Sequence, residues 1–144
     1  MKPEIQTEGE FKGWSYWPSE AFEYDTAGPF YYKKIGDEYV SRFRAEDKHL
    51  NSGGTIHGGC LMTFADFALF AIAADHIEFY GVTVAFTSEF LSGPRSGQLI
   101  EARGEVLKSG RSIVFVRGVI TADGEPALNF SGTIKKIKPP KEET

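Results

Sequence analysis

The alternation of hydrophobic and polar residues predicts a pair of strands after the first 28 residues. Residues 29–35 are aromatic and β-branched, and residues 38–45 alternate between apolar and polar side chains. A period of two residues is typical of a strand with one buried face. Because Gly36-Asp37 separates the two segments, we expect a tight turn there. A polar, glycine-containing loop should follow at residues 46–54.

Residues 56–77 predict one long helix that is buried on nearly all sides. Apolar residues recur at helical spacing on two neighbouring stripes, one that includes Phe64 and Ala68 and another that includes Leu69. Because these stripes almost encircle the helix, we expect protein to surround it. Its most apolar part, residues 60–74, contains polar residues and is too short to span a membrane.

Four further strands are expected after the helix, separated by turn-forming residues. They cover residues 82–91, 98–107, 111–121 and 126–137. Consecutive strands joined by turns form an antiparallel sheet. A single apolar helix beside one sheet is buried best if the sheet curls around it. The predicted fold class is therefore α+β, with a curved antiparallel sheet wrapped around one long central helix.

The two ends of the chain differ from the segment between them. Residues 1–28 place aromatic side chains among glycine, proline, serine and glutamate. Such an extension packs on the core, contacts a second subunit, or forms a flap over a substrate pocket. Residues 138–144 are polar, with two prolines, and should fray. We therefore expect an aromatic-rich extension (1–28), one domain (29–137) and a polar tail (138–144).

Composition narrows the classes of function. A chain of 144 residues with a net charge of −4 forms one ordinary domain and is not typical of a general nucleic-acid binder. The single cysteine, Cys60, excludes an intrachain disulfide and suits a reducing compartment. Residues 1–10 are polar and acidic, so we see no signal peptide there and expect a cytoplasmic protein.

Asp66 is the first candidate for chemistry. It lies between Ala65 and Phe67 in the apolar helix, where an ionised carboxylate is costly unless it is hydrogen-bonded or faces a polar cavity. Burial should raise the pKa of Asp66, which suits a base or a nucleophile. The structural alternative is a hydrogen bond to a neighbouring backbone group or an ion pair with an arginine.

Gly58-Gly59 opens the same helix. The first turn of a helix leaves backbone N–H groups unpaired, its dipole favours negative charge, and glycine lets a ligand approach closely. The pair can therefore form an oxyanion hole, or it can serve a tight turn. His57 precedes the pair and Asn51 lies six residues before His57, so either side chain can bond its own loop or orient a carbonyl or a water.

The spacing of these candidates has a consequence for assembly. Gly58 and Asp66 are eight residues apart, which is about 12 Å along a helix. One reacting carbon cannot reach both in the same chain. If both act in catalysis, Asp66 of one subunit must lie beside Gly58 of another, in at least a dimer with shared sites.

Together these motifs resemble the hotdog-fold thioesterases, most closely the phenylacetate-pathway and 4-hydroxybenzoyl-CoA types. The resemblance covers roughly residues 31–137 and depends on Asn51, then His57-Gly58-Gly59, then Asp66 nine residues after the histidine. It also includes two stretches beside the strand that follows the helix, Gly81-Val82-Thr83 and Leu91-Ser92-Gly93-Pro94. It implies the hotdog fold, hydrolysis of acyl-CoA, and a homodimer or homotetramer.

The resemblance also implies a role for each matching residue. Asp66 would be the general base or the nucleophile, and the Gly58 N–H would polarise the thioester carbonyl. Asn51 would steady the reacting groups, His57 would lie near the carbonyl, and Thr83 would help to place the attacking water. No metal or other cofactor is implied, since coenzyme A is part of the substrate.

Substrate-binding residues are expected on both sides of this centre. Gly59 belongs to the same helix start, and Phe64 and Phe67 are candidates for the acyl pocket, although both could equally be core. In relatives the turns between the late strands hold the nucleotide, which makes candidates of three basic residues that could also be solvated surface: Arg95, Lys108 and Arg111.

Other classes of protein remain open. The strongest alternative is a hotdog domain that binds acyl-CoA without hydrolysing it; relatives that control transcription generally carry a DNA-binding segment, and residues 1–28 do not resemble one. A hydratase would place its catalytic histidine and acid elsewhere. A purely structural protein would leave Asp66 without a purpose in its apolar helix. The sequence does not indicate which acyl group is used.

Overall fold

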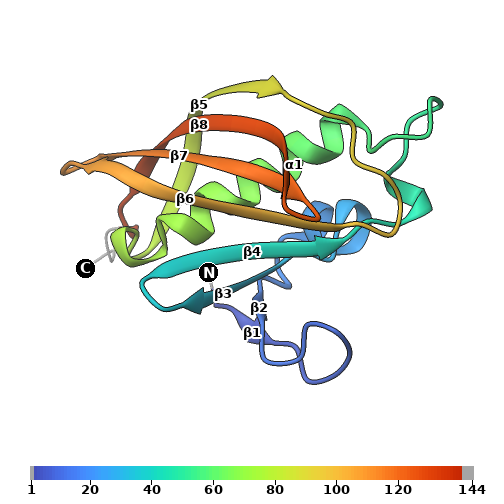
Figure 1. Cartoon of the computed structure of the whole chain (residues 1–144). Coiled ribbons are helices and arrows are strands. Elements are labelled where there is room, and N and C mark those ends of the chain that lie inside the picture. The colour runs from blue at the N-terminus through green and yellow to red at the C-terminus, as the bar shows by residue number, and fades with distance from the viewer. Residues whose placement is uncertain (1, 141–144) are drawn as a thin grey trace.

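The computed structural model describes residues 2–140 and contains one antiparallel sheet, in the order β1-β2-β3-β4-β6-β7-β8-β5, with one main helix (Figure 1). The elements are β1 (Glu4–Ile5), β2 (Ser15–Tyr16), the π-helical turn η1 (Phe22–Ala27), β3 (Tyr31–Ile35), β4 (Glu38–Arg44), the 3-10 turn η2 (Asp47–His49), α1 (Gly58–Ile72), the 3-10 turn η3 (Ala74–His76), β5 (Tyr80–Phe90), β6 (Leu99–Ser109), β7 (Ile113–Ala122) and β8 (Glu125–Ile137).

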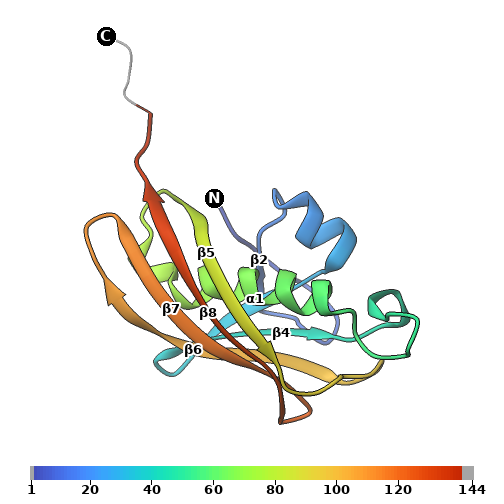
Figure 2. The ribbon, with the colours of Figure 1, turned by 90° about the horizontal axis from the view of Figure 1, so that it is seen from above.

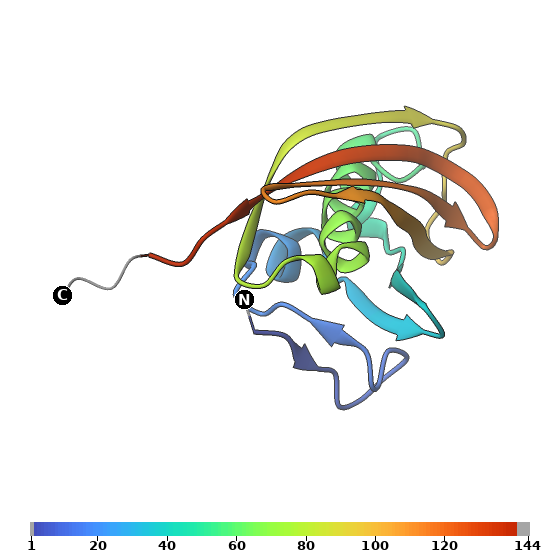
Figure 3. The same cartoon turned by 90° about the vertical axis from the view of Figure 1, so that its left-hand side faces the viewer.

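The sheet curls around α1, as the sequence predicted (Figures 2 and 3). Along α1, Phe64, Ala65 and Ala68 are fully buried against side chains from the inner faces of the strands. A helix with apolar residues on most of its surface must be covered on most of its surface, and the curved sheet does this. The α+β class and the wrapped-helix architecture are confirmed.

Helix α1 is shorter than the predicted segment at both ends. Ile56 forms an isolated bridge with Leu50, and its N–H donates to the Pro94 carbonyl at 2.8 Å, so the backbone is extended there. At the other end the α-helix gives way to η3. The Asp75 carboxylate in η3 accepts a hydrogen bond from the Tyr39 hydroxyl at 2.7 Å. Contacts distant in sequence therefore set both ends.

The six strands predicted between residues 29 and 137 are all present, with ends that move by one or two residues. The turn between β7 and β8 has positive φ at both Asp123 (47°) and Gly124 (87°). Positive φ at both central residues is the geometry of the two-residue hairpin that Asp-Gly favours. The consecutive strands β6, β7 and β8 pair as the turn signals indicated, whereas β5 pairs with β8 rather than with β6.

The first half of the extension covers the outer face of the sheet at β3 and β4. Trp14 packs with Tyr31 and Val40 in a small cluster, and the Arg42 guanidinium lies 5.0 Å from the Trp14 ring centroid. Val40 points away from the main core, yet it is fully buried because the extension covers it. The extension is thus integrated with the sheet.

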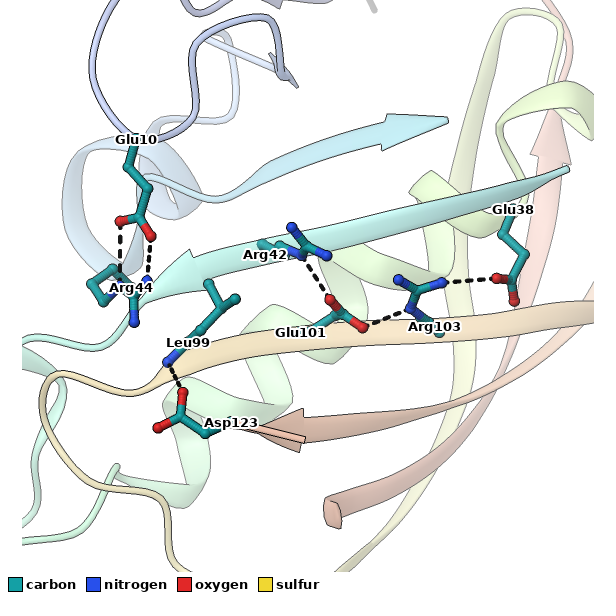
Figure 4. A network of polar contacts seen from close by, with 8 residues as sticks. All are labelled: Glu10, Glu38, Arg42, Arg44, Leu99, Glu101, Arg103 and Asp123. Carbon is teal, nitrogen blue, oxygen red and sulfur yellow. Dashed lines mark hydrogen bonds and ion pairs between the residues drawn. The ribbon is translucent and has the colours of Figure 1, made fainter. Parts of the chain in front are cut away.

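Ion pairs follow the same outer face across neighbouring strands (Figure 4). Glu10 of the extension pairs with Arg44 on β4. Glu101 on β6 bridges Arg42 and Arg103, at 2.7 Å and 2.6 Å. These contacts connect the extension, β4 and β6. Within the described residues, no helix is both long and apolar enough to cross a membrane.

Candidate active site

Asp66 and Thr83 form the centre of the site. Asp66 lies midway along α1 and Thr83 lies near the start of β5, and the Thr83 hydroxyl donates to Asp66 Oδ1 at 2.6 Å. Burial raises the pKa of the Asp66 carboxyl, and the Thr83 hydrogen bond opposes that rise by stabilising the ionised form. The helix thus holds a carboxylate whose basicity is increased by burial and whose orientation is fixed by a neighbouring strand.

A cavity of about 250 Å³ opens beside this pair. Aromatic side chains of α1, of β5 and of the extension form much of its wall, and three carboxyl groups border it. Its lining consists of Trp17, Glu20, Glu23, Asp66, Phe67, Phe70, Tyr80, Gly81, Val82 and Thr83. Asp66 therefore borders a cavity as well as the packed core. Among the described residues it forms no ion pair with an arginine, which was one structural alternative to a catalytic role.

The sequence interpretation missed the two glutamates of the extension. Glu20 and Glu23 follow Trp17 at intervals of three residues, and all three reach the same cavity. Residues three apart in a helical turn lie on one face. That spacing was the available signal, but it is visible only once residues 17–23 are known to turn rather than to extend.

The start of α1 leaves one backbone donor free. His57 caps the helix: its Nδ1 accepts from the Gly59 N–H at 2.8 Å, and its carbonyl accepts from the Cys60 N–H at 2.9 Å. The Gly58 N–H has no hydrogen-bond partner within residues 2–140. Because His57 already uses the Gly59 N–H, Gly58 rather than Gly59 presents a donor to a ligand.

A side chain at position 58 would disturb this helix start. A Cβ placed on Gly58 would lie 3.0 Å from Cζ of Phe90, at the far end of β5. Glycine therefore lets α1 begin close against β5. The structure confirms that Gly58 and Asp66 lie on one helix, so the estimate of about 12 Å between them holds for a single chain.

Cys60 is not prepared for nucleophilic chemistry. Burial raises the pKa of its thiol to about 11, so the thiol stays protonated at neutral pH. Among the described residues, no three His, Cys, Asp or Glu side chains are grouped so that they could hold a metal ion. The carboxylate of Asp66 is therefore the candidate reactive group at this centre.

Asn51 uses its amide within its own loop. Its Oδ1 accepts from the Gly53 N–H at 2.9 Å and from the Thr55 N–H at 3.2 Å, and its Nδ2 donates to Thr55 Oγ1 at 3.1 Å. These bonds match the loop-capping alternative. A contact between Asn51 and reacting groups stays a prediction.

The two phenylalanines considered for the acyl pocket have different surroundings. Phe67 borders the cavity beside Asp66. Phe64 is fully buried, with its ring 4.8 Å from that of Phe43 and 5.1 Å from that of Phe30, and it does not reach the cavity. The expectation that Phe64 lines the pocket is not supported, because the helix turns this side chain toward β4.

The structure separates the three basic residues proposed for the nucleotide. All three are exposed. Arg95 precedes β6, whereas Lys108 and Arg111 lie at its other end, and the nine residue steps from Leu99 to Lys108 span about 30 Å. They do not form one patch within a chain, and their contact with a nucleotide stays a prediction.

A larger groove, of about 810 Å³, lies at the C-terminal end of α1, around Tyr39, Ile72 and Asn129. Its arginines are paired: Arg103 with Glu38 at 3.0 Å, and Arg117 with Glu105 at 2.6 Å. None of the predicted catalytic residues borders it. The smaller cavity is therefore the candidate active site, because Asp66 and Thr83 border it and do not border the larger groove.

Comparison with known sequences identifies the family of the chain. A model of the thioesterase superfamily matches residues 53–127, which include the helix start, Asp66 and Thr83. A candidate esterase of Pseudomonas aeruginosa is 35% identical over 111 residues, which cover 75% of this chain and 83% of that protein. Human acyl-coenzyme A thioesterase 13 is 29% identical over 77 residues, which cover 53% of this chain and 55% of that enzyme.

Solved structures share the fold. The Escherichia coli PaaI protein of the phenylacetic acid degradation operon superposes with a TM-score of 0.72 at 20% identity, covering 83% of this chain and 86% of that one. A hypothetical thioesterase of Streptococcus pneumoniae, solved with coenzyme A, gives 0.65 at 22% identity, covering 74% and 86%. These similarities confirm that the sheet and helix form a hotdog fold.

Proposed function

Because the chain belongs to the thioesterase superfamily, we propose that it hydrolyses an acyl-CoA thioester to the free acid and coenzyme A, with Asp66 as the reacting carboxylate. One observation carries the proposal. The Asp66 carboxylate is hydrogen-bonded by Thr83 at 2.6 Å and borders a cavity, whereas a scaffold carboxylate would be paired or solvated. A thioester is reactive enough for a carboxylate and backbone donors to suffice.

In the hydrolytic step, ionised Asp66 takes a proton from water as the water oxygen attacks the thioester carbon. The C–S bond then breaks and the proton passes to the leaving sulfur. The raised pKa of Asp66 makes it a stronger base than a solvated aspartate. Direct attack by Asp66, followed by hydrolysis of the anhydride, uses the same residues.

The negative charge that develops on the carbonyl oxygen needs a donor. The free Gly58 N–H at the positive end of α1 is suited to this role, and one such donor typically contributes about 10²–10³ in rate. Since Gly58 and Asp66 of one chain are about 12 Å apart, the donor would come from a second subunit.

An exposed strand supports assembly into such a dimer. β5 is an edge strand of 11 residues beside the site, and its exposed apolar side chains include Val82 (42%), Val84 (56%) and Phe90 (54%). A long apolar edge is usually covered in the functional state. Pairing through this region would bring Thr83 and Asp66 of one subunit toward the helix start of the other.

The cavity limits the acyl group. An engineered cavity of about 150 Å³ holds a benzene ring, and the cavity beside Asp66 measures about 250 Å³. We therefore expect a compact acyl group, with Trp17, Phe67 and Phe70 as its apolar contacts.

The test is hydrolysis of a panel of acyl-CoAs by the purified full chain, followed by free-thiol release. Asp66→Asn should lower the rate by about 10²-fold or more while the oligomeric state is unchanged. Asp75→Asn is the matched control, because Asp75 lies outside the cavity, and it should keep the wild-type rate. Equal rates for wild type and Asp66→Asn would reject the role of Asp66. Acyl-CoA binding without hydrolysis by wild type would favour a non-hydrolytic binding protein.

A further inference from the structure

Two glutamates of the extension share the cavity with Asp66, and neither has a role in the mechanism above. Glu23 borders two hollows, whereas Glu20 borders one. Glu23 lines the cavity beside Asp66 and also a small hollow among Tyr16, Tyr24 and Phe67. Its carboxyl group forms no ion pair within residues 2–140. A carboxyl group placed between aromatic rings and another carboxylate requires an explanation.

Glu23 is held in place from both sides along the chain. Before it, Trp17 is buried, with its ring 4.5 Å from that of Tyr32 and 5.0 Å from that of Phe67. After it, the Ala27 carbonyl is bonded to His49 Nε2 at 2.7 Å. The Gly28 carbonyl accepts from the Lys48 ammonium. The segment that carries Glu23 is therefore fixed against the site.

The titratable groups that share the two linings with Glu23 are acidic or phenolic. Glu20 faces it from the extension, Asp66 from α1 and Tyr80 from β5, and Tyr16 and Tyr24 line the hollow on its other side. Neither lining contains a lysine, arginine or histidine. Burial, together with the negative charges of Glu20 and Asp66, raises the pKa of Glu23 to about 8.

The neighbouring carboxyl group has a different environment. Asp66 receives the Thr83 hydrogen bond, which favours its ionised form, whereas no described side chain donates to Glu23. When two carboxyl groups share a site, their titrations separate, and the group with the weaker support for its charge keeps a proton. We therefore expect Asp66 to be the ionised member of the pair and Glu23 the neutral one.

We propose that Glu23 is a further residue of the active site, a positioning residue that must hold its proton while ionised Asp66 performs the reaction. This inference rests on the proposed function. Negative charge develops on the thioester carbonyl during attack, and a second anion in the cavity would oppose it. Neutral Glu23 also supplies the cavity with a hydrogen-bond donor. The proton stays on Glu23 through the cycle.

The first test is the pH profile of kcat/KM from about pH 5 to about pH 10, for wild type and three variants. Wild type should lose activity as the pH rises through the range in which Glu23 ionises, near 8. Glu23→Gln keeps a neutral donor, so its activity at neutral pH should lie within about tenfold of wild type and should no longer fall in that range.

Two variants serve as controls for charge. Glu20→Gln removes one negative neighbour of Glu23, so the alkaline decline should move to lower pH. Asp25→Asn removes a carboxylate from the same turn outside both linings and should reproduce the wild-type profile. If wild type and Glu23→Gln decline in the same way, the role of Glu23 is rejected while that of Asp66 stands.

A second measurement does not depend on activity. The ¹³C resonance of the Glu23 carboxyl reports its protonation directly in the folded protein. Its titration in wild type should be centred well above the ordinary range for glutamate, and Asp66→Asn should move it to lower pH, because the charge of Asp66 contributes to the shift. An ordinary titration, unmoved by Asp66→Asn, would overturn the pairing even if the chain hydrolysed no thioester.

Discussion

Removal of the Thr83 hydroxyl should change the pH at which the enzyme becomes active. In Thr83→Val the side chain keeps its shape and loses the hydrogen bond of 2.6 Å to Asp66 Oδ1. Burial raises the pKa of Asp66 and the Thr83 bond lowers it, so the loss of this bond should raise the pKa further. The acid limb of the pH profile should therefore move to higher pH.

The size of the shift follows from the strength of the bond. A hydrogen bond to a charged group contributes about 1.5–3 kcal/mol, and one pKa unit corresponds to about 1.4 kcal/mol. The acid limb of kcat/KM should move upward by roughly one to two pH units. At the acid end of the profile the variant should lose much more activity than on the plateau, since more of Asp66 is protonated there.

The assay is free-thiol release from one acyl-CoA across the acid range, with wild type, Thr83→Val and Thr83→Ser measured together. Serine keeps a hydroxyl at this position, so its acid limb should stay close to that of wild type. An acid limb at the same pH in Thr83→Val would show that Asp66 is not the group whose ionisation controls the rate, or that Thr83 does not hold it in solution.

Three further outcomes are expected. Phe64→Ala should lower the free energy of unfolding in urea by about 3–5 kcal/mol, whereas Phe79→Ala, at a side chain that is 48% exposed, should lower it far less. Succinyl-CoA should be hydrolysed at least about tenfold less efficiently than butyryl-CoA, because its terminal carboxylate would enter a cavity bordered by carboxyl groups and no cation; equal kcat/KM values would refute this. Glu23 binds a proton more tightly in the folded than in the unfolded protein, so the free energy of unfolding should fall as the pH rises from about 4.5 to about 8. In urea titrations at several pH values, Glu23→Gln should weaken this fall.

The strands were predictable because their signals are local. Alternation marks a half-buried strand, and turn residues such as Asp123-Gly124 mark where it reverses. The ends of the helix were not predictable in the same way. Ile56 continues the apolar pattern of the helix, but Leu50 and Pro94 hold it in an extended conformation. No local pattern encodes those partners.

The residues of the candidate site were likewise predictable only in part. Asp66 could be identified because a carboxylate in an apolar helix is anomalous wherever the chain goes. Phe64 and Phe67 could not be distinguished, since both are apolar and only the packing shows that one meets Phe43 and the other borders the cavity. Glu23 looks like any surface glutamate in the sequence, because its burial comes entirely from the docking of the extension.

That docking depends on the register of a very short strand. In β2, Ser15 pairs with Tyr32 on β3, and successive side chains of a strand point to opposite faces. Trp14 therefore packs on the outer face, whereas Trp17 reaches the main core beside Phe67. A slip of one residue would exchange the faces and remove Trp17 from the cavity wall. The aromatic residues of the extension thus fix the register that places Glu23 at the same cavity as Asp66. The extension is therefore part of the catalytic architecture that we propose.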